Sequence, residues 1–346
     1  MPERLAVGID IGGTKIAGGV VDEDGRVVAR ARRATPSTDS TAVLDAIADL
    51  VEEFRDSYAV RAVGVGAAGY VDVTGSTVVF SPHLAWRNEP LRDAVVRRTR
   101  LPVLVDNDAN AAGWAEWRFG AAQNQPDVVL VNLGTGIGGA MVLDGRLYRG
   151  HSGMAGEFGH QRVVDDGRPC ECGNRGCWEQ YASGHVLDRR ARAAVEQATD
   201  TGRALVDLAG AADRVDGRVV AELASRGHAE AVEWIAEVGR WLGIGLANLA
   251  AALDPNIFVI GGGVSDNGEL LLRPARTAFG DHLTGRGYRS EARIVAAHLG
   301  NDAGVVGAAD LARLRARRRR PASPGYSVPG PAVARSGRRR RRPRPR

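Results

Sequence analysis

The sequence predicts an α/β protein built from two similar halves that face each other across a cleft. A strand, a glycine-rich loop and a second strand open the chain, and the same unit recurs near its middle. The first copy reads Asp10-Ile-Gly-Gly-Thr-Lys and the second reads Asn132-Leu-Gly-Thr-Gly. Two copies so far apart indicate two related halves rather than a solenoid of short repeats. Clefts between such halves are common ligand sites.

The first half is predicted to be a three-strand meander followed by a helix and two more strands. Apolar and alternating runs predict the strands, and Asp22-Glu-Asp-Gly25 marks a turn. Leu44, Ile47, Ala48 and Val51 lie on one face of the helix. The predicted strands cover 5–11, 16–21, 26–30, 62–66 and 102–105, and the helix covers about 42–54.

The second half repeats the glycine hairpin and continues with a long helix over about 229–253, which Asp254-Pro255 ends. A buried strand at 257–260 runs into a third glycine loop, and a last helix is predicted at 303–314. We expect an N-terminal α/β domain at 1–110 and a C-terminal α/β domain at 111–300, with the segment 301–314 packing back on the first domain. The segment 315–346 is rich in Arg and Pro, and we expect it to be disordered.

The formal net charge of +5 conceals an acidic body. Fourteen arginines and no acidic residues lie between Arg313 and Arg346, so removing them leaves −9 for the rest of the chain. An acidic body argues against a nucleic-acid-binding surface on the domains. The sequence has no apolar run long enough for a membrane span and no signal-peptide pattern, so we expect a cytoplasmic protein with reduced thiols.

All three cysteines lie within eight residues, and a histidine precedes them by ten. Three thiolates and one imidazole complete a tetrahedral zinc shell with no position for water, which is typical of a structural Zn²⁺ site. Unliganded buried thiols are the alternative, and a disulfide would leave one cysteine over. Glu157 and Glu179 flank the motif, so the metal would hold them in one small region. The predicted ligands are His160, Cys170, Cys172 and Cys177.

Three glycine loops follow β-like runs, and such loops let backbone N–H groups approach phosphate oxygens. Together they predict a nucleotide site, although none matches the P-loop or Rossmann pattern. Asp10 precedes the first loop and is a candidate for holding Mg²⁺ through water, or alternatively for bracketing a turn. Lys15, the only lysine, ends that loop. The loop residues are Gly12, Gly13 and Thr14, then Gly134, Thr135 and Gly136, then Gly261, Gly262 and Gly263.

The segment Asp106-Asn107-Asp108-Ala-Asn110 follows a strand and opens a helix, where α/β sheets bind ligands. One of these residues is expected to cap the helix, and capping alone is the alternative to a site. Three consecutive polar residues exceed what a cap needs. A phosphoryl acceptor hydroxyl requires a carboxylate to take its proton, and Asp108 is the candidate base. Asn107, Glu157, His160 and Glu179 suit sugar hydroxyls.

These motifs together resemble the ROK family (repressor, open reading frame, kinase), most closely its bacterial ATP-dependent glucokinases, over about Leu5 to Leu314. The resemblance implies an actin-like ATPase (ribonuclease H-like) fold with two domains around a cleft. It implies that Asp108 is the general base, with ATP, Mg²⁺ and a structural Zn²⁺ as cofactors. It also implies that His160 both ligates zinc and faces the sugar. Sugar contacts are implied at Gly69, Asn107, Asp108, Glu157, His160 and Glu179, although Ala68 stands where many relatives have proline.

The expected reaction is transfer of the γ-phosphate of ATP to the 6-hydroxyl of glucose. The acceptor could instead be N-acetylmannosamine, N-acetylglucosamine or fructose, and polyphosphate recruited by the arginine-rich tail could also be a donor. A sugar sensor without catalysis is a further alternative. The chain begins four residues before its first strand, so no DNA-binding domain is expected. The family implies a homo-oligomer, either a dimer or a tetramer.

Overall fold

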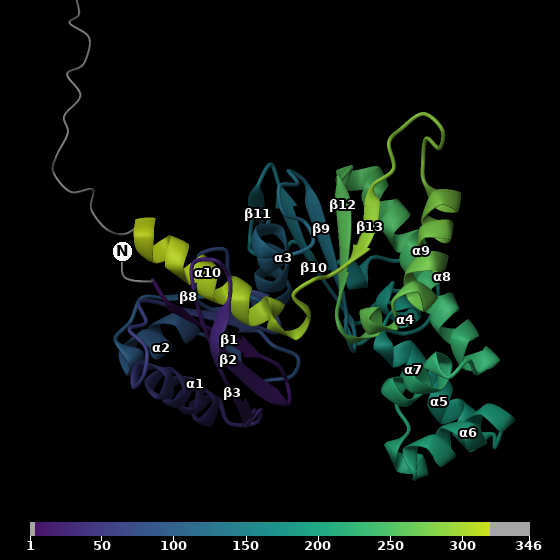
Figure 1. Cartoon of the computed structure of the whole chain (residues 1–346), viewed down its shortest axis with the longest axis horizontal. Helices are drawn as coiled ribbons and strands as arrows, with labels where there is room; N and C mark the ends of the chain where they lie inside the picture. The colour runs from purple at the N-terminus through teal and green to yellow at the C-terminus, as the bar shows by residue number, and fades with distance from the viewer. Residues whose placement is uncertain (1–3, 319–346) are drawn as a thin grey trace, which may run out of the picture.

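The N-terminal meander forms one side of a five-stranded sheet. The computed structural model describes residues 4–318 and contains two such sheets, which stand side by side in Figure 1. In the first, the order is β3-β2-β1-β4-β8, with β1, β2 and β3 antiparallel and β1, β4 and β8 parallel. Its strands are β1 (Ala6–Ile11), β2 (Lys15–Val21), β3 (Val27–Ala34), β4 (Val63–Ala67) and β8 (Val103–Asn107).

The second sheet has the same order and the same strand directions. Its order is β11-β10-β9-β12-β13, with an antiparallel meander joined to two parallel strands. The sequence repeat therefore corresponds to two structurally equivalent halves. The strands are β9 (Val128–Leu133), β10 (Ile137–Leu143), β11 (Arg146–Tyr148), β12 (Ile257–Gly261) and β13 (Arg293–Ala296).

Helices cover the sheets, and each half has its own apolar core. Ile9, Ile47 and Val65 belong to the first core, and Val131, Leu246 and Phe258 to the second. The helix predicted at 42–54 forms as α1, and the Asp39 carboxylate caps it by accepting from two backbone N–H groups of its first turn. The principal helices are α1 (Ser40–Arg55), α2 (Leu91–Thr99), α3 (Asp108–Phe119), α8 (Ala229–Leu253), α9 (Glu269–His282) and α10 (Ala303–Arg318).

Several elements have no counterpart among the predicted ones. Three helices project beyond α8 in the lower right of Figure 1, and a small antiparallel sheet follows β4. The helices are α5 (Gly184–Glu196), α6 (Asp200–Ala209) and α7 (Gly217–Ser225), preceded by the short α4 (Glu179–Ala182). The small sheet contains β5 (Tyr70–Val71), β6 (Val78–Phe80) and β7 (Arg87–Glu89). The 3₁₀ turns are η1 (Phe158–His160), η2 (Ala212–Arg214), η3 (Gly263–Asn267) and η4 (Gly300–Asp302).

The last helix, α10, leaves the second sheet and packs on α3 and on β1 and β4 of the first half (Figure 1). Its backbone comes so close that a Cβ on Gly64 would lie 1.8 Å from the Ala308 carbonyl oxygen. The helix continues to Arg318 rather than ending at Leu314, so the tail boundary predicted at 315 is wrong. Arginine favours helix, and Arg315 donates to the Thr74 carbonyl at 2.8 Å while Arg317 pairs with Glu23.

The remainder of the predicted disordered tail, 319–346, lies outside the described residues. Within residues 4–318, no helix has both the length and the apolar character that a membrane crossing requires. The positions of the domain boundaries near 110 and 300 stay predictions.

Candidate active site

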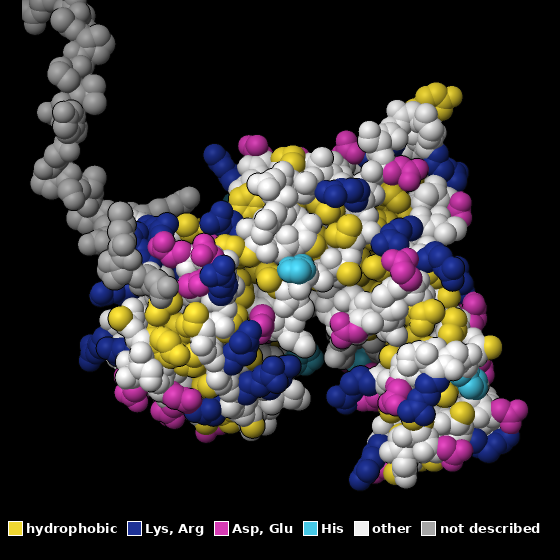
Figure 2. Space-filling view, viewed as in Figure 1, with side chains coloured by type: hydrophobic (Ala, Val, Ile, Leu, Met, Phe, Trp, Pro, Cys, Tyr) yellow, Lys and Arg dark blue, Asp and Glu magenta, His cyan; other side chains and the backbone are white. Residues whose placement is uncertain are grey.

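A cavity of about 520 Å³ lies between the two halves, where Figure 2 shows a notch in the surface. The carboxyl end of β8 and the start of α3 form one wall, and the segment around η1 and α4 forms the other. Of the predicted site residues, the cavity brings together Gly69, Asn107, Asp108, Gly134, Thr135, Gly136, Glu157, His160, Cys172 and Glu179.

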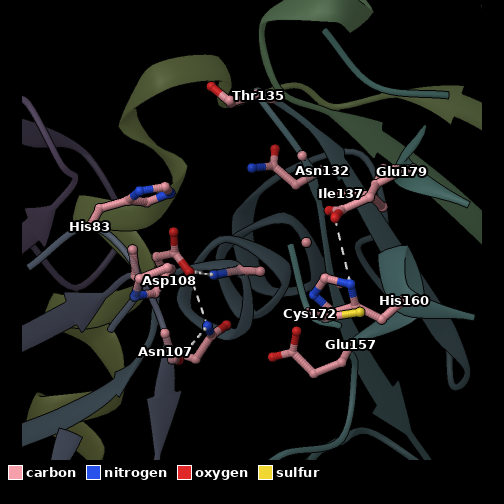
Figure 3. Close-up of a pocket in the computed structure, with 18 of the residues that line it drawn as sticks. His83, Asn107, Asp108, Asn132, Thr135, Ile137, Glu157, His160, Cys172 and Glu179 are labelled. Atoms are coloured by element: carbon pink, nitrogen blue, oxygen red, sulfur yellow. Dashed lines mark hydrogen bonds and ion pairs between the residues drawn. The ribbon is translucent and has the colours of Figure 1, made fainter. Parts of the chain in front are cut away.

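The first wall is built around the helix cap that the sequence predicts. Asn107 is the N-cap of α3, and its side-chain oxygen accepts from the Asn110 N–H at 3.0 Å. Its amide nitrogen donates to the Gly69 carbonyl at 3.1 Å and to Asp108 Oδ1 at 3.0 Å. The cap therefore also orients Asp108, whose carboxyl group faces the open centre of the cavity in Figure 3.

Gly69 must be a glycine at its position in this wall. Its φ is +119°, and a Cβ there would lie 2.2 Å from the Phe80 carbonyl oxygen. The close approach brings the Gly69 carbonyl to Asn107, so the glycine allows the hydrogen bond that orients the capping amide.

Burial sets the acidity of Asp108. Removal from water raises the pKa of this carboxyl group, because the charged form loses its hydration. Hydrogen bonds from the Ala109 N–H at 2.9 Å and from Asn107, together with the charge of His83, oppose that rise. The net direction is upward, which makes Asp108 a better proton acceptor than an ordinary aspartate.

The second wall presents Glu157, His160 and Glu179, which face Asp108 across the cavity (Figure 3). Burial raises the pKa of Glu157, an effect that His160 opposes and that the charges of Asp108 and Glu179 reinforce. Glu179 begins α4, and its Oε1 lies 3.5 Å from His160 Nδ1. The wall therefore combines carboxylate acceptors with an imidazole, which is a set of groups that can hold several hydroxyls.

The four predicted metal ligands converge. One ligand atom from each of His160, Cys170, Cys172 and Cys177 lies within 4.8 Å of all the others. Cys170 Sγ is 3.7 Å from His160 Nδ1, and Cys172 Sγ is 3.6 Å from Cys177 Sγ. A tetrahedron with ~2.3 Å Zn–S bonds has edges of about 3.8 Å. The donor set and its spacing therefore fit a tetrahedral zinc ion.

The second glycine loop lies against the second wall. A Cβ on Gly136 would lie 2.7 Å from Glu179 Oε2, so a side chain at this position would displace the Glu179 carboxylate. The third loop packs beside it, since a Cβ on Gly262 would lie 2.4 Å from the Leu133 carbonyl oxygen. The residues Gly261, Gly262 and Gly263 do not line the cavity.

The first glycine loop also lies outside the cavity lining. The lining does not include the loop residues Gly12, Gly13, Thr14 and Lys15, or Asp10 before them. Burial, followed by the charge of Asp108, raises the pKa of Asp10 to about 7, and Lys15 opposes the shift. Asp10 is thus close enough to Asp108 for their charges to interact.

Sequence reasoning missed several residues that line the cavity. His83 lies on the loop after β6 and faces Asp108 in Figure 3, and Asn132, the next-to-last residue of β9, lies between the two walls. Tyr70 and Phe80 come from the small sheet that was not predicted. The strands of this sheet are only two or three residues long. Such short runs carry little periodic signal, so sequence patterns do not indicate these strands.

The family model described as ROK family matches residues 6–315. The chain belongs to the ROK family. The glucokinase of Streptomyces coelicolor is 48% identical over 310 residues, covering 89% of this chain and 98% of that protein. A crystal structure of a ROK family glucokinase from Streptomyces griseus, in complex with glucose and AMPPNP, is 51% identical with a TM-score of 0.83. The match covers 90% of this chain and 99% of that one.

A ROK hexokinase from Thermus thermophilus is 33% identical with a TM-score of 0.75, and the match covers 91% of this chain and 99% of that one. These solved structures are similar to this chain over both halves, so the predicted actin-like ATPase fold is confirmed. The motifs that carried the resemblance therefore identified both the family and the fold.

Proposed function

We propose that this chain is an ATP-dependent glucokinase, which transfers the γ-phosphate of ATP to the 6-hydroxyl of glucose. The observation that carries the proposal is the placement of Asp108 opposite Glu157, His160 and Glu179 in one cavity. Its similarity to the Streptomyces glucokinases, one of them solved with glucose and AMPPNP, supports the same reaction.

Asp108 accepts the proton of the attacking hydroxyl. Its carboxyl group is fixed by Asn107 and by the Ala109 N–H, and its raised pKa favours proton transfer. Asn107, Glu157, His160 and Glu179 bind the remaining hydroxyls and orient the sugar, so that one hydroxyl reaches the base. Gly69, whose carbonyl accepts from Asn107, belongs to the first wall and is a further sugar contact in this proposal.

The glycine loops receive the nucleotide. Gly134, Thr135 and Gly136 line the cavity. The loops at 12–14 and 261–263, one in each half, would contact the phosphates through their backbone N–H groups. Asp10 and Lys15 stand next to the first loop, where a carboxylate can hold hydrated Mg²⁺. Bound Mg²⁺ would neutralise charge on the transferred phosphate.

His160 has two roles in this proposal. Its Nδ1 faces Cys170 Sγ at 3.7 Å and would ligate zinc, while its other ring nitrogen points toward the cavity in Figure 3. Zinc bound by this His and three Cys ligands would be structural, because all four positions are filled by protein. The metal site thereby fixes the ring that contacts the sugar.

The test is the Asp108→Asn variant. We expect kcat to fall by about 10²- to 10⁴-fold, because a general base is lost while its shape is kept. Glucose binding, measured by titration calorimetry, should persist. Asp281→Asn, at an exposed position near the end of α9, is the matched control and should retain wild-type kcat. Near-normal turnover by Asp108→Asn would refute the assignment.

A coupled assay for ADP with a panel of sugars tests the acceptor. Glucose should give the highest kcat/KM among glucose, fructose, N-acetylglucosamine and N-acetylmannosamine. Glucose binding without ADP production would instead identify a sensor. The predicted homo-oligomer and the cytoplasmic location stay predictions, and light scattering in solution tests the first.

A further inference from the structure

An aspartate that the proposed reaction does not use lies directly behind the base. Asp106 is on β8, two residues before Asp108, and its side chain is 4% exposed. Its Oδ1 accepts from the Asn107 N–H at 3.0 Å and from the Asn110 side-chain amide at 3.1 Å. Asp106 therefore braces the turn that carries Asn107 and Asp108.

The other carboxylate oxygen of Asp106 is bound by a residue of the opposite half. Asp106 Oδ2 accepts from Arg149 Nε at 3.0 Å and also from a terminal guanidinium nitrogen of Arg149. Arg149 directly follows β11 of the second sheet. Two donors from one rigid guanidinium plane define the direction of the contact as well as its length.

Arg149 begins a tight loop, 149–156, that leads directly into Glu157. The Ala155 N–H donates to the Arg149 carbonyl at 3.1 Å, so the two ends of the loop are tied together. Gly150, Gly153 and Gly156 all have positive φ, and a Cβ on Gly153 would lie 2.3 Å from the Val71 carbonyl oxygen. The loop thus rests on the first half at two places, through Arg149 and through Gly153.

We propose that the Asp106–Arg149 ion pair is a positioning device that sets the base and the sugar-binding wall relative to each other. One end of the pair braces Asp108, and the other anchors the loop that ends at Glu157. The inference rests on the proposed function, because it assumes that these two residues act on one sugar. Misplacement by about 1 Å can cost on the order of 10²-fold in rate.

The pair also borders a second cavity, of about 690 Å³, which makes it accessible to small ions. Asp106, Arg149, Arg146, Trp114 and Leu147 are among the residues that line it. A guanidinium ion supplied from solution can therefore reach Asp106 when the Arg149 side chain has been removed. This access permits a rescue experiment that separates positioning by a cation from general loss of structure.

The experiment measures kcat and the KM values for glucose and ATP in Arg149→Ala, Arg149→Lys and the control Arg146→Ala. We expect Arg149→Ala to lower kcat by about 10- to 100-fold and to raise the KM for glucose. The KM for ATP should stay within about twofold, because the pair does not brace the glycine loops. The kcat of Arg149→Lys should lie between those of the wild type and Arg149→Ala, since lysine supplies the charge without the planar donors. Arg146→Ala should match the wild type.

Ethylguanidinium at millimolar concentration should restore part of the kcat of Arg149→Ala, whereas ethylammonium should restore less and neither should affect Arg146→Ala. In Asp106→Asn/Arg149→Ala, the loss should be smaller than the product of the two single losses, because the residues act as a pair. Wild-type kcat and glucose KM in Arg149→Ala would overturn the inference. The inference would also be overturned if Arg149→Lys lost as much kcat as Arg149→Ala and ethylguanidinium restored none of it.

These outcomes are distinct from failure of the proposed function. If the wild type does not phosphorylate glucose, or if Asp108→Asn remains active, the proposed function fails. If Asp108→Asn is inactive while Arg149→Ala behaves like the wild type, only the positioning role fails.

Discussion

Asp108 shows how local contacts and burial compete within one side chain. Burial disfavours the carboxylate, whereas the Ala109 N–H, the Asn107 amide and the charge of His83 favour it. Burial prevails, so the pKa lies above the ordinary value. Asn107, the uncharged residue that caps α3, thus stands next to an aspartate that binds a proton more readily than an ordinary aspartate does.

The pH dependence of turnover follows from that shift. Only the deprotonated form of Asp108 can accept the hydroxyl proton, so activity should fall as the pH drops through its raised pKa. We expect the acid limb of kcat/KM for glucose to lie above the ordinary aspartate value of about 3.9. A pH–rate profile measures it, with circular dichroism to verify that the protein stays folded. An acid limb at or below the ordinary value would contradict the burial argument.

Sequence patterns were enough to predict some residues of the cavity but not others. Asn107 and Asp108 follow a strand and open a helix, so their place at the end of β8 could be inferred locally. His83 and Tyr70 lie in irregular or very short segments, and only the folded chain brings them to the cavity. Local spacing cannot report such long-range contacts. The roles assigned to the site residues stay proposals.

At the scale of elements, the cysteine segment acts as a wall of the site. Cys170 and Cys177 are buried, while Cys172 is exposed and lines the cavity. The segment has few regular elements of its own, and two isolated bridges, between Arg162 and Cys177 and between Pro169 and Arg175, hold it together. A metal ion would therefore supply much of its rigidity.

Removal of the metal tests this element. The purified protein should contain about one Zn²⁺ per chain, and a chelator should raise the KM for glucose and lower the melting temperature. Added Zn²⁺ should restore both. Cys172→Ser should reproduce the effect of the chelator, and metal content is measured by plasma emission spectrometry. A metal-free protein with unchanged glucose KM would show that the segment holds its shape unaided.

At the level of the whole fold, two connections within residues 4–318 join halves that have separate cores. One runs from α3 to β9, and the other runs from β13 to α10, seen as the yellow-green segment in Figure 1. Glu116 on α3 ties them together, because its buried carboxylate accepts from the His298 and Leu299 N–H groups, the latter at 2.7 Å. The same group accepts from the Ala121 N–H at 2.8 Å.

Glu116→Gln should weaken this junction. The neutral amide would place a donor where backbone N–H groups already donate, so we expect the free energy of unfolding to fall by about 1–3 kcal/mol. Denaturant unfolding measures the change. Glu196→Gln, at an exposed position on α5, is the control and should change stability by less than ~0.5 kcal/mol. Equal stability of both variants would exclude Glu116 as a structural tie.

Sequence patterns alone were enough to predict the family, the α/β class, the repeated sheet unit and the grouping of the four metal-ligand candidates. Each of these features depends on the spacing of residues that are close together in the chain. Strand periodicity and glycine loops make that spacing visible in the sequence. The packing of α10 on the first half was already expected from the sequence. The folded chain adds that Arg149 reaches Asp106 and that His83 and Tyr70 line the cavity. These contacts depend on packing between segments distant in the chain, which no local pattern encodes.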